Sequence, residues 1–186
     1  MEHIELDSGA LRVLAHPLRS RLLSALRLHG PANATALADR LGTNTGATSY
    51  HLRKLAEVGL VEETAEGTGK QRFWAAAQDS HGWRNTKYRD DPDAEAAAAW
   101  LRDQQFRNLA GRVAEWERER ERWPVAWQEA VTSSDAIVEL SAEQLRELND
   151  ELWAVLMRYR DLPPGPDSGQ IVVHVVALPA EPRNAP

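Results

Sequence analysis

The sequence of 186 residues contains no cysteine. A chain without cysteine has no disulfide framework, no thiolate metal site and no thiol nucleophile, so nothing in it requires an oxidising compartment. Long apolar runs are also missing, because no stretch approaches the roughly 20 apolar residues that cross a bilayer. The N-terminus has no basic start followed by an apolar run. We therefore expect a cytoplasmic protein that does not bind a membrane.

Patterns that carry catalysis or bind metal ions are equally scarce. Ser133 and Ser134 have no histidine near them in the sequence, and no glycine-rich phosphate loop occurs. The Glu/Arg run at 116–122 has the composition of a solvated helix face. No two of the six histidines stand four residues apart on one helix, the spacing that suits a metal ion. We therefore expect no enzyme, no metal site and no cofactor.

Basic residues are the minority, with 22 Lys/Arg against 28 Asp/Glu, which argues against binding nucleic acid by bulk charge. The charge is uneven along the chain. Residues 1–90 hold 12 basic and 10 acidic side chains, whereas residues 91–186 hold 10 and 18. We interpret this as two parts with different electrostatic tasks, and solvated faces that differ by chance are the alternative.

Helix signals dominate the first sixty residues. Side chains that cap helices and a proline mark the starts, and glycines mark the ends. The predicted helices begin at Asp7 or Ser8, at Pro17, after Asn33 and after Asn44, and the last ends before Gly59. Two alternating segments around a glycine-containing tip then predict a β-hairpin that ends near residue 76.

The rest of the chain reads as a connector followed by mixed structure. The apolar residues of 78–92 show no regular spacing. From Asp93 towards Pro124 they recur at helical spacing, which predicts a long helix. The later elements expected are a short helix at 125–130, a strand at 135–141, a helix with a capping box of Ser141 and Gln144, and a strand at 171–178. The predicted fold class is mainly α (α+β). It has a winged helix-turn-helix at 1–77, a connector at 78–92, and a long dimerisation helix with a small strand-helix-strand region at 93–186.

The helix after Asn44 has two faces. Thr48, Leu52 and Leu55 share one face and should point into the core. The opposite face suits DNA, because an α-helix fits the major groove, which is about 12 Å wide, and its hydroxyls, tyrosine and cations can meet base edges or phosphates there. The residues expected to contact DNA, with two cations from the hairpin, are Asn44, Thr45, Gly46, Ser49, Tyr50, His51, Arg53, Lys54, Lys70 and Arg72. A merely solvated basic face is the alternative.

One stretch resembles the DNA-binding domain of ArsR-type transcriptional regulators. The resemblance rests on AHPLR at 15–19, SYHLRKL at 49–55 and VGLV at 58–61, in that order, and it covers about residues 9–76. It implies a homodimeric regulator, usually a repressor, that binds an imperfect inverted repeat. Founding members of the family sense metals, but this sequence lacks their cysteines and the Asp-x-His spacing of the zinc-sensing type.

Apolar and aromatic residues of the second half point to dimerisation and to an effector. The residues expected at the dimer interface are Leu11, Leu101, Phe106, Leu109 and Val113. Six of the seven tryptophans lie beyond the helix-turn-helix, where large rings pack cores and interfaces. The sharper hypothesis is an aromatic pocket for a small organic effector, lined by Trp116, Trp123, Trp127 and Trp153.

These observations predict a sequence-specific, double-stranded DNA-binding transcriptional regulator, a homodimeric repressor of ArsR type that does not sense metal through cysteine. An activator, or a regulator insensitive to any ligand, is compatible with the same residues. The alternative from another class is a protein-interaction module that partners or antagonises another regulator without binding DNA. Glutamates at 57, 62, 63 and 66 offset the cations of the recognition surface and favour that alternative.

Overall fold

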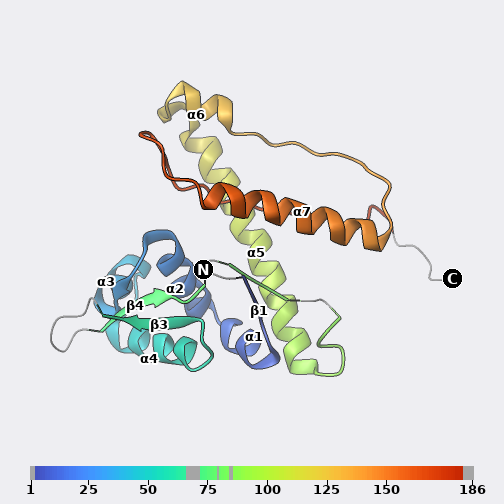
Figure 1. Ribbon diagram of the computed structural model, residues 1–186. Coiled ribbons are helices and arrows are strands. Elements are labelled where there is room, and N and C mark those ends of the chain that lie inside the picture. Colours follow the sequence, from blue (N-terminus) through green and yellow to red (C-terminus); the bar gives the residue numbers. More distant parts are fainter. Residues whose placement is uncertain (1–2, 66–71, 79, 84–85, 182–186) are drawn as a thin grey trace. The chain divides into compact units, whose positions relative to one another are not determined.

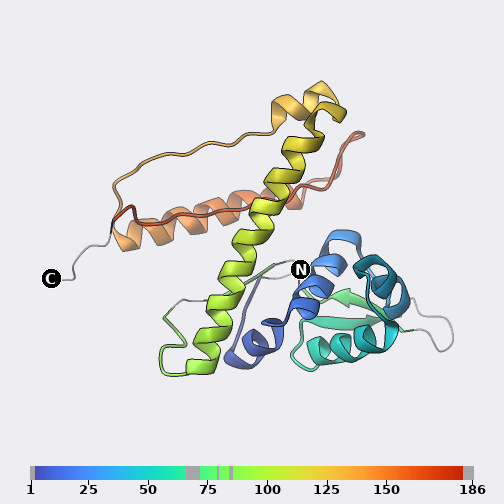
Figure 2. The ribbon, with the colours of Figure 1, turned by 180° about the vertical axis from the view of Figure 1, so that it is seen from behind.

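The computed structural model describes residues 3–65, 72–78, 80–83 and 86–181, so Lys70 lies outside the described residues. The chain divides into two compact units, Met1–Val113 and Ala114–Pro186. Figures 1 and 2 show the helices and strands of both units. The described residues are mainly helical with a small antiparallel sheet, which confirms the expected fold class. None of the described helices is long and apolar enough to cross a membrane.

The first unit contains the helices and strands nearest the N-terminus, together with most of a long helix. The helices are α1 (Ser8–Leu14), α2 (Pro17–His29), α3 (Ala34–Leu41), α4 (Thr45–Ala56) and α5 (Pro92–Glu119), which continues into the second unit. The strands are β1 (His3–Glu5), β2 (Ala32–Asn33), β3 (Val61–Thr64), β4 (Phe73–Ala76) and β5 (Ser80–Gly82).

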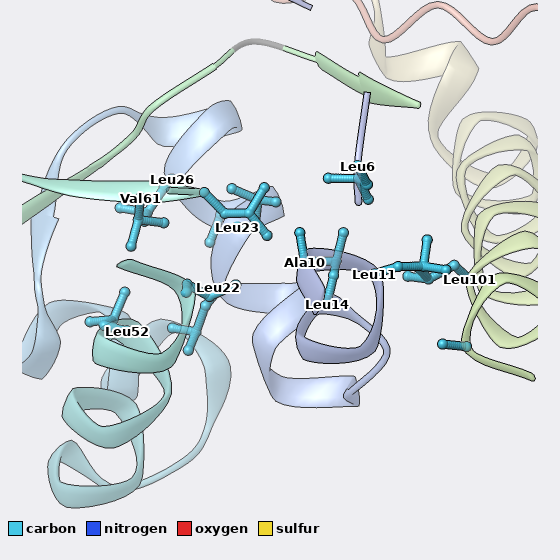
Figure 3. Close-up of a cluster of buried hydrophobic side chains, with 14 of the residues drawn as sticks. Leu6, Ala10, Leu11, Leu14, Leu22, Leu23, Leu26, Leu52, Val61 and Leu101 are labelled. Carbon is cyan, nitrogen blue, oxygen red and sulfur yellow. The ribbon is translucent and has the colours of Figure 1, made fainter. Parts of the chain in front are cut away.

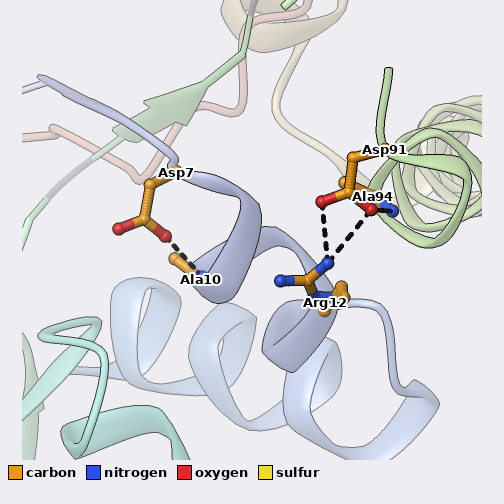
Figure 4. Close-up of polar contacts among 5 residues, drawn as sticks. All are labelled: Asp7, Ala10, Arg12, Asp91 and Ala94. Atoms are coloured by element: carbon orange, nitrogen blue, oxygen red, sulfur yellow. Dashed lines mark hydrogen bonds and ion pairs between the residues drawn. The ribbon is translucent and has the colours of Figure 1, made fainter. Parts of the chain in front are cut away.

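The helices begin where the caps predict. The Oδ1 atom of Asp7 accepts the backbone N–H of Ala10 at 2.7 Å (Figure 4), and the Oδ1 atom of Asn44 accepts that of Ala47 at 2.8 Å. Each bond satisfies one of the N–H groups that a helix start leaves unpaired. Gly42 ends α3 with a φ of 64°, a left-handed conformation that costs glycine little.

The winged region is a three-stranded antiparallel sheet in the order β2-β4-β3. β3 and β4 form the predicted hairpin, with Val61 opposite Ala76 and Thr64 opposite Phe73. β2 pairs with the other edge of β4, where Ala32 lies opposite Trp74. The sequence does not predict β2, because two residues are too few to show an alternating pattern.

The predicted connector is partly structured. β5 pairs in parallel with β1, and the Tyr88 hydroxyl, on a buried ring, donates to the backbone oxygen of Leu6. An Arg12 Nη1 atom of α1 lies 2.8 Å from an Asp91 carboxylate oxygen, just before α5 (Figure 4). The expected boundary at residue 77 therefore falls inside the first unit. β5 belongs to the first unit because it pairs with β1, some eighty residues away in the sequence. The local sequence of residues 78–92 contains no signal for such a long-range contact.

The core of the first unit is built mainly from leucines and alanines of several elements (Figure 3). Its largest fully buried side chains are Leu6, Leu11, Leu14, Leu22, Leu23, Leu26, Leu37, Leu52, Leu55, Leu60 and Thr48. Leu101 of α5 is buried in the same cluster as Leu11 of α1. The core therefore holds α1, α2, α4 and the first half of α5 in one body, and it fixes the face that α4 turns outward.

The second unit contains helices but no strand among its described residues. After α5 come the 3₁₀ turn η1 (Arg120–Arg122), α6 (Val125–Ala130) and α7 (Ala142–Arg160). The capping box of Ser141 and Gln144 is confirmed. The strands predicted at 135–141 and 171–178 are wrong, since neither segment is assigned as a strand or joins a sheet of the described residues. A strand needs a neighbour for its backbone hydrogen bonds, and apolar composition alone does not supply one.

Candidate nucleic-acid interface

α4 presents to solvent the face that the sequence assigns to DNA. Thr48, Leu52 and Leu55 are fully buried, as predicted. The side chains turned the other way include Thr45, Gly46, Tyr50 and Arg53, which are exposed, and the half-buried Ser49. The N-cap residue, Asn44, is also exposed at the start of the helix. Short hydroxyls, a phenol and a guanidinium thus share one accessible surface, as contact with a major groove requires.

A pocket of about 360 Å³ opens along this surface. It is lined by Asn33, Ala34, Thr35, Thr45, Ser49, Arg53, Arg72 and Trp74. Three of these residues follow one another at single-turn spacing on α4, while the others come from the start of α3 and from the wing. Arg53 and Arg72 therefore border one hollow, where two cations and a helix start favour an anionic group such as phosphate.

Sequence reasoning missed half of the residues that line this pocket. Asn33, Ala34, Thr35 and Trp74 join it because β2 pairs with β4, which brings the start of α3 beside the wing. The sequence did indicate a helix start at Asn33, which caps α3, and helix starts bind anions. It did not indicate that the start of α3 lies beside the hairpin.

The cations of this surface differ in their partners. The Arg53 Nε atom donates to the Ser49 backbone oxygen at 3.2 Å, and no carboxylate of the described chain pairs with Arg53. Lys54 lies 2.7 Å from Glu57, whose hydrogen bond and charge raise the pKa of Lys54. Arg72 lies 2.7 Å from Glu63. Exposed ion pairs contribute little to stability, so a phosphate can replace either glutamate.

His51 is half-buried and contacts two neighbouring rings. Its ring packs against the ring of His16, with 4.4 Å between the centroids, and lies edge-on to Tyr50 at 5.1 Å. The Nδ1 atom of His51 is buried and has no hydrogen-bond partner among the described residues. His16 caps α2 by accepting the backbone N–H of Leu18 at Nδ1, at 3.1 Å. His51 therefore packs between α4 and the start of α2, and its contact with phosphate stays a prediction.

This histidine pair predicts that acid destabilises the first unit. Desolvation by burial and then the charge of Arg19 lower the pKa of His16, and desolvation followed by the charges of His16 and Arg19 lowers the pKa of His51. The unfolded chain therefore takes up protons first as the pH falls below 6.5. Stability should be complete above that pH and should decrease as the pH falls towards the lowered pKa values.

Chemical denaturation of the full chain at pH 7.5, 6.5 and 5.5 measures this loss. The double variant His16→Asn, His51→Gln should lose less stability than the wild type over the same range. His29, exposed at the end of α2, provides the matched control, and His29→Gln should respond to pH as the wild type does. An equal loss in wild type and double variant would contradict the role of the pair.

Gly46 offers a test of close approach to DNA. A Cβ atom at this position would meet only the Asn44 Oδ1 atom, at 3.4 Å, so the fold does not require glycine there. Gly46→Ala should keep or raise the free energy of unfolding, by up to about 1 kcal/mol, because alanine favours helix. It should nevertheless weaken DNA binding if the helix backbone approaches the groove closely.

Thermal melting and gel shift with the same preparation measure the two effects of Gly46→Ala. Gly111→Ala is the control, since Gly111 is a helical glycine of α5 whose added Cβ would meet nothing within 4 Å. It should gain stability and leave DNA binding unchanged. Unchanged DNA affinity in Gly46→Ala would show that the backbone does not approach the DNA.

The residues predicted for dimerisation and effector binding fall into separate groups. Leu11 and Leu101 are buried within the chain's own core, whereas Phe106 and Val113 are exposed and Leu109 is half-buried on α5. Trp116, Trp123 and Trp127 follow one another with centroid distances of 6.0 and 6.1 Å. Trp153 lies on α7 and is exposed. The effector pocket stays a prediction, which ligand-dependent quenching of tryptophan fluorescence would check.

A family model described as a helix-turn-helix domain matches residues 14–64, from the end of α1 to the end of β3. These residues are a helix-turn-helix domain. The match agrees with the resemblance of the sequence to ArsR-type regulators, and α4 lies within the matched residues. Among the described residues, no three His, Asp or Glu side chains form a group that could hold a metal ion.

Several solved structures are similar to parts of the chain. The homodimeric winged helix-turn-helix domain of Mb0332 from Mycobacterium bovis, a possible ArsR-family transcriptional regulator, is 27% identical, with 38% of this chain and 63% of that chain covered and a TM-score of 0.34. A possible transcriptional regulator for arsenical resistance is 29% identical over 57% of this chain and 95% of its own, with a TM-score of 0.34. RV1404 from Mycobacterium tuberculosis is 15% identical over 81% of each chain, with a TM-score of 0.33.

The chain thus spans less than two thirds of the Mb0332 fragment. No curated protein matches the sequence. The family model covers the helix-turn-helix domain, and the second unit lies outside the matched residues 14–64.

Proposed function

We propose that this chain is a cytoplasmic, homodimeric repressor of ArsR type that binds a specific double-stranded operator and does not sense metal through cysteine. DNA-binding transcriptional regulation follows from the helix-turn-helix domain. The observation that carries the proposal is the pocket on the outer face of α4, where Arg53 and Arg72 border one hollow beside exposed Thr45. No catalytic role is proposed for any residue.

The recognition would divide between the two kinds of contact that DNA offers. Thr45, Ser49 and Tyr50 on the outer face of α4 would meet base edges, which carry sequence information. Lys54 and Arg72 would bind phosphates and position the domain, together with Lys70. Arg53 lies between the two groups and can reach either a guanine or a phosphate.

A homodimer would give this interface its operator. Two recognition helices read successive faces of the major groove when their separation is close to one helical turn, about 34 Å. An inverted repeat would match the twofold symmetry of the protein. The exposed Phe106 and Val113 with Leu109 would form the α5 part of the dimer contact. A ligand that changes this contact would also change DNA affinity.

Gel shift with the DNA upstream of the chain's own gene tests the proposal at low and moderate salt. Three or four cations per copy should release counterions from about six to eight phosphates in a dimer, so affinity should fall by roughly a thousandfold or more between 50 and 200 mM salt. A specific complex with this salt dependence supports the proposal. No complex with any genomic fragment would contradict it.

The ion pairs of the recognition surface favour the second candidate, a module that binds another regulator and not DNA. Glu57 and Glu63 each hold a cation that the DNA contact would use. The same gel shift separates the two candidates, since the interaction module should form no complex at any salt concentration.

A further inference from the structure

α7 is a well-formed helix that the described residues cover only in part. Its start is closed by the capping box and its last turn carries Arg158 and Arg160. Leu145 and Leu148 are half-buried, but none of its residues is buried. Because most helical stability in proteins comes from packing an apolar face, the open part of α7 is available to a partner surface.

The spacing of the apolar residues on α7 shows what kind of partner fits. They recur at alternating intervals of three and four residues, in the order Leu145, Leu148, Leu152, Val155 and Tyr159. This is the seam of a coiled coil, in which each side chain inserts between side chains of a facing helix. The last three members are at least 37% exposed, so the seam is open. A helix with the same spacing is the natural partner, and a second copy supplies one.

The charges of α7 select the direction of pairing. The first half of the helix carries four acidic residues and one basic residue, and the second half carries only basic ones among its charged side chains: Glu143, Arg146, Glu147, Asp150, Glu151, then Arg158 and Arg160. In an antiparallel pair the acidic half of each helix lies beside the basic half of the other. Such a pair also has the twofold symmetry that closes a dimer.

An independent feature of the same unit points to a second copy. Residues 171–178, IVVHVVAL, are apolar at nearly every position, which is typical of a strand covered on both faces. The structure leaves Ile171, Val173 and Val176 more than half exposed in an extended segment that pairs with no described strand. An unpaired extended segment is a template for a strand of another chain.

We propose that α7 and residues 171–178 form a self-association surface that takes a second copy of this chain, with the two α7 helices antiparallel. The inference rests on the proposed homodimer and adds where the copies meet. Both elements expose apolar side chains that such a contact would bury, including Leu152, Val155 and Tyr159 of α7 and Ile171, Val173 and Val176 of the extended segment.

Light scattering on the full chain tests the surface. The wild type should be a dimer at micromolar concentration, and Leu152→Glu and Val155→Glu should each weaken self-association by roughly 10-fold to 100-fold. Val125→Glu on α6 is the matched control, because it adds the same charge at an exposed apolar position of the same unit and should leave the dimer intact. A monomeric wild type, or an unchanged dimer in both α7 variants, would overturn the proposal.

Single cysteines test the direction of pairing, because the chain has no cysteine of its own. The twofold axis of an antiparallel seam passes near its central member, so Leu152→Cys should cross-link to itself on mild oxidation. Leu145→Cys should not, since the two copies of that position would lie about 21 Å apart along the axis. A mixture of Leu145→Cys and Tyr159→Cys chains should cross-link. Self-cross-linking of Leu145→Cys would indicate parallel helices and overturn the antiparallel arrangement.

The two proposals fail in distinguishable ways. If the chain forms the predicted dimer but binds no DNA, the self-association surface is supported and the proposed DNA-binding regulator is contradicted. If the chain stays monomeric but binds a half-site in a salt-dependent manner, DNA binding is supported and the self-association surface is contradicted.

Discussion

Replacing Arg53 with alanine should weaken specific DNA binding by about 1 to 3 kcal/mol per half-site, or roughly 5-fold to 150-fold, without unfolding the protein. Arg53 is exposed on the outer face of α4, borders the pocket beside Arg72, and lacks a carboxylate partner among the described residues. Its guanidinium is therefore available to a base edge or a phosphate. Gel shift at one fixed salt concentration measures the change.

A second substitution at the same position identifies the contact. Arg53→Lys keeps the positive charge and loses the planar fork that binds guanine at two points. A phosphate contact should survive this change in large part, whereas a base contact should be lost as fully as in Arg53→Ala. Wild-type affinity in Arg53→Ala would show that Arg53 does not take part in DNA binding.

Leu52→Ala, one residue earlier, should lower the stability of the fold, whereas Arg53→Ala should lower DNA affinity and leave stability unchanged. Leu52 is fully buried and packs in the core with leucines of α1 and α2 (Figure 3). Removing three carbons there loses apolar burial and leaves a cavity, which should lower the free energy of unfolding by about 2 to 5 kcal/mol. Urea denaturation followed by circular dichroism measures the loss.

Arg53→Ala is the matched control for this stability measurement, because the two residues are neighbours on α4 and Leu52 is buried whereas Arg53 is exposed. The exposed position should change the free energy of unfolding by no more than about 0.5 kcal/mol. A loss below about 1 kcal/mol in Leu52→Ala would mean that the core closes around the missing side chain. In that case the packing of α4 against α2 would not determine which face of α4 is turned to solvent.

The sequence was most informative where the causes of structure are local. Asp7, Asn33 and Asn44 cap helices through their own side chains, and Gly42 ends one through its own backbone, so the helices could be predicted. The apolar spacing of Thr48, Leu52 and Leu55 likewise predicted which face of α4 is buried. These signals act within about one turn of the chain.

The features that could not be predicted depend on residues distant in sequence. β1 and β5 are three residues each and exist as a pair, and the contact between His16 and His51 joins segments 35 positions apart in the numbering. The lining of the pocket by α3 depends on the same kind of long-range pairing. At 171–178 the apolar pattern predicted a strand, but strand formation depends on a neighbouring strand that the pattern does not specify.

The anchoring of α5 makes this helix a lever. Within the first unit, its first turns are held by the Arg12–Asp91 ion pair and by Leu101 in the core, while the twelve residues from Arg102 to Val113 extend about 18 Å beyond that attachment. A tilt of about 5° at the anchored base displaces Val113 by roughly 1.6 Å. Conversely, a force applied at Val113 is transmitted to α1 through the contact of Leu101 with the core.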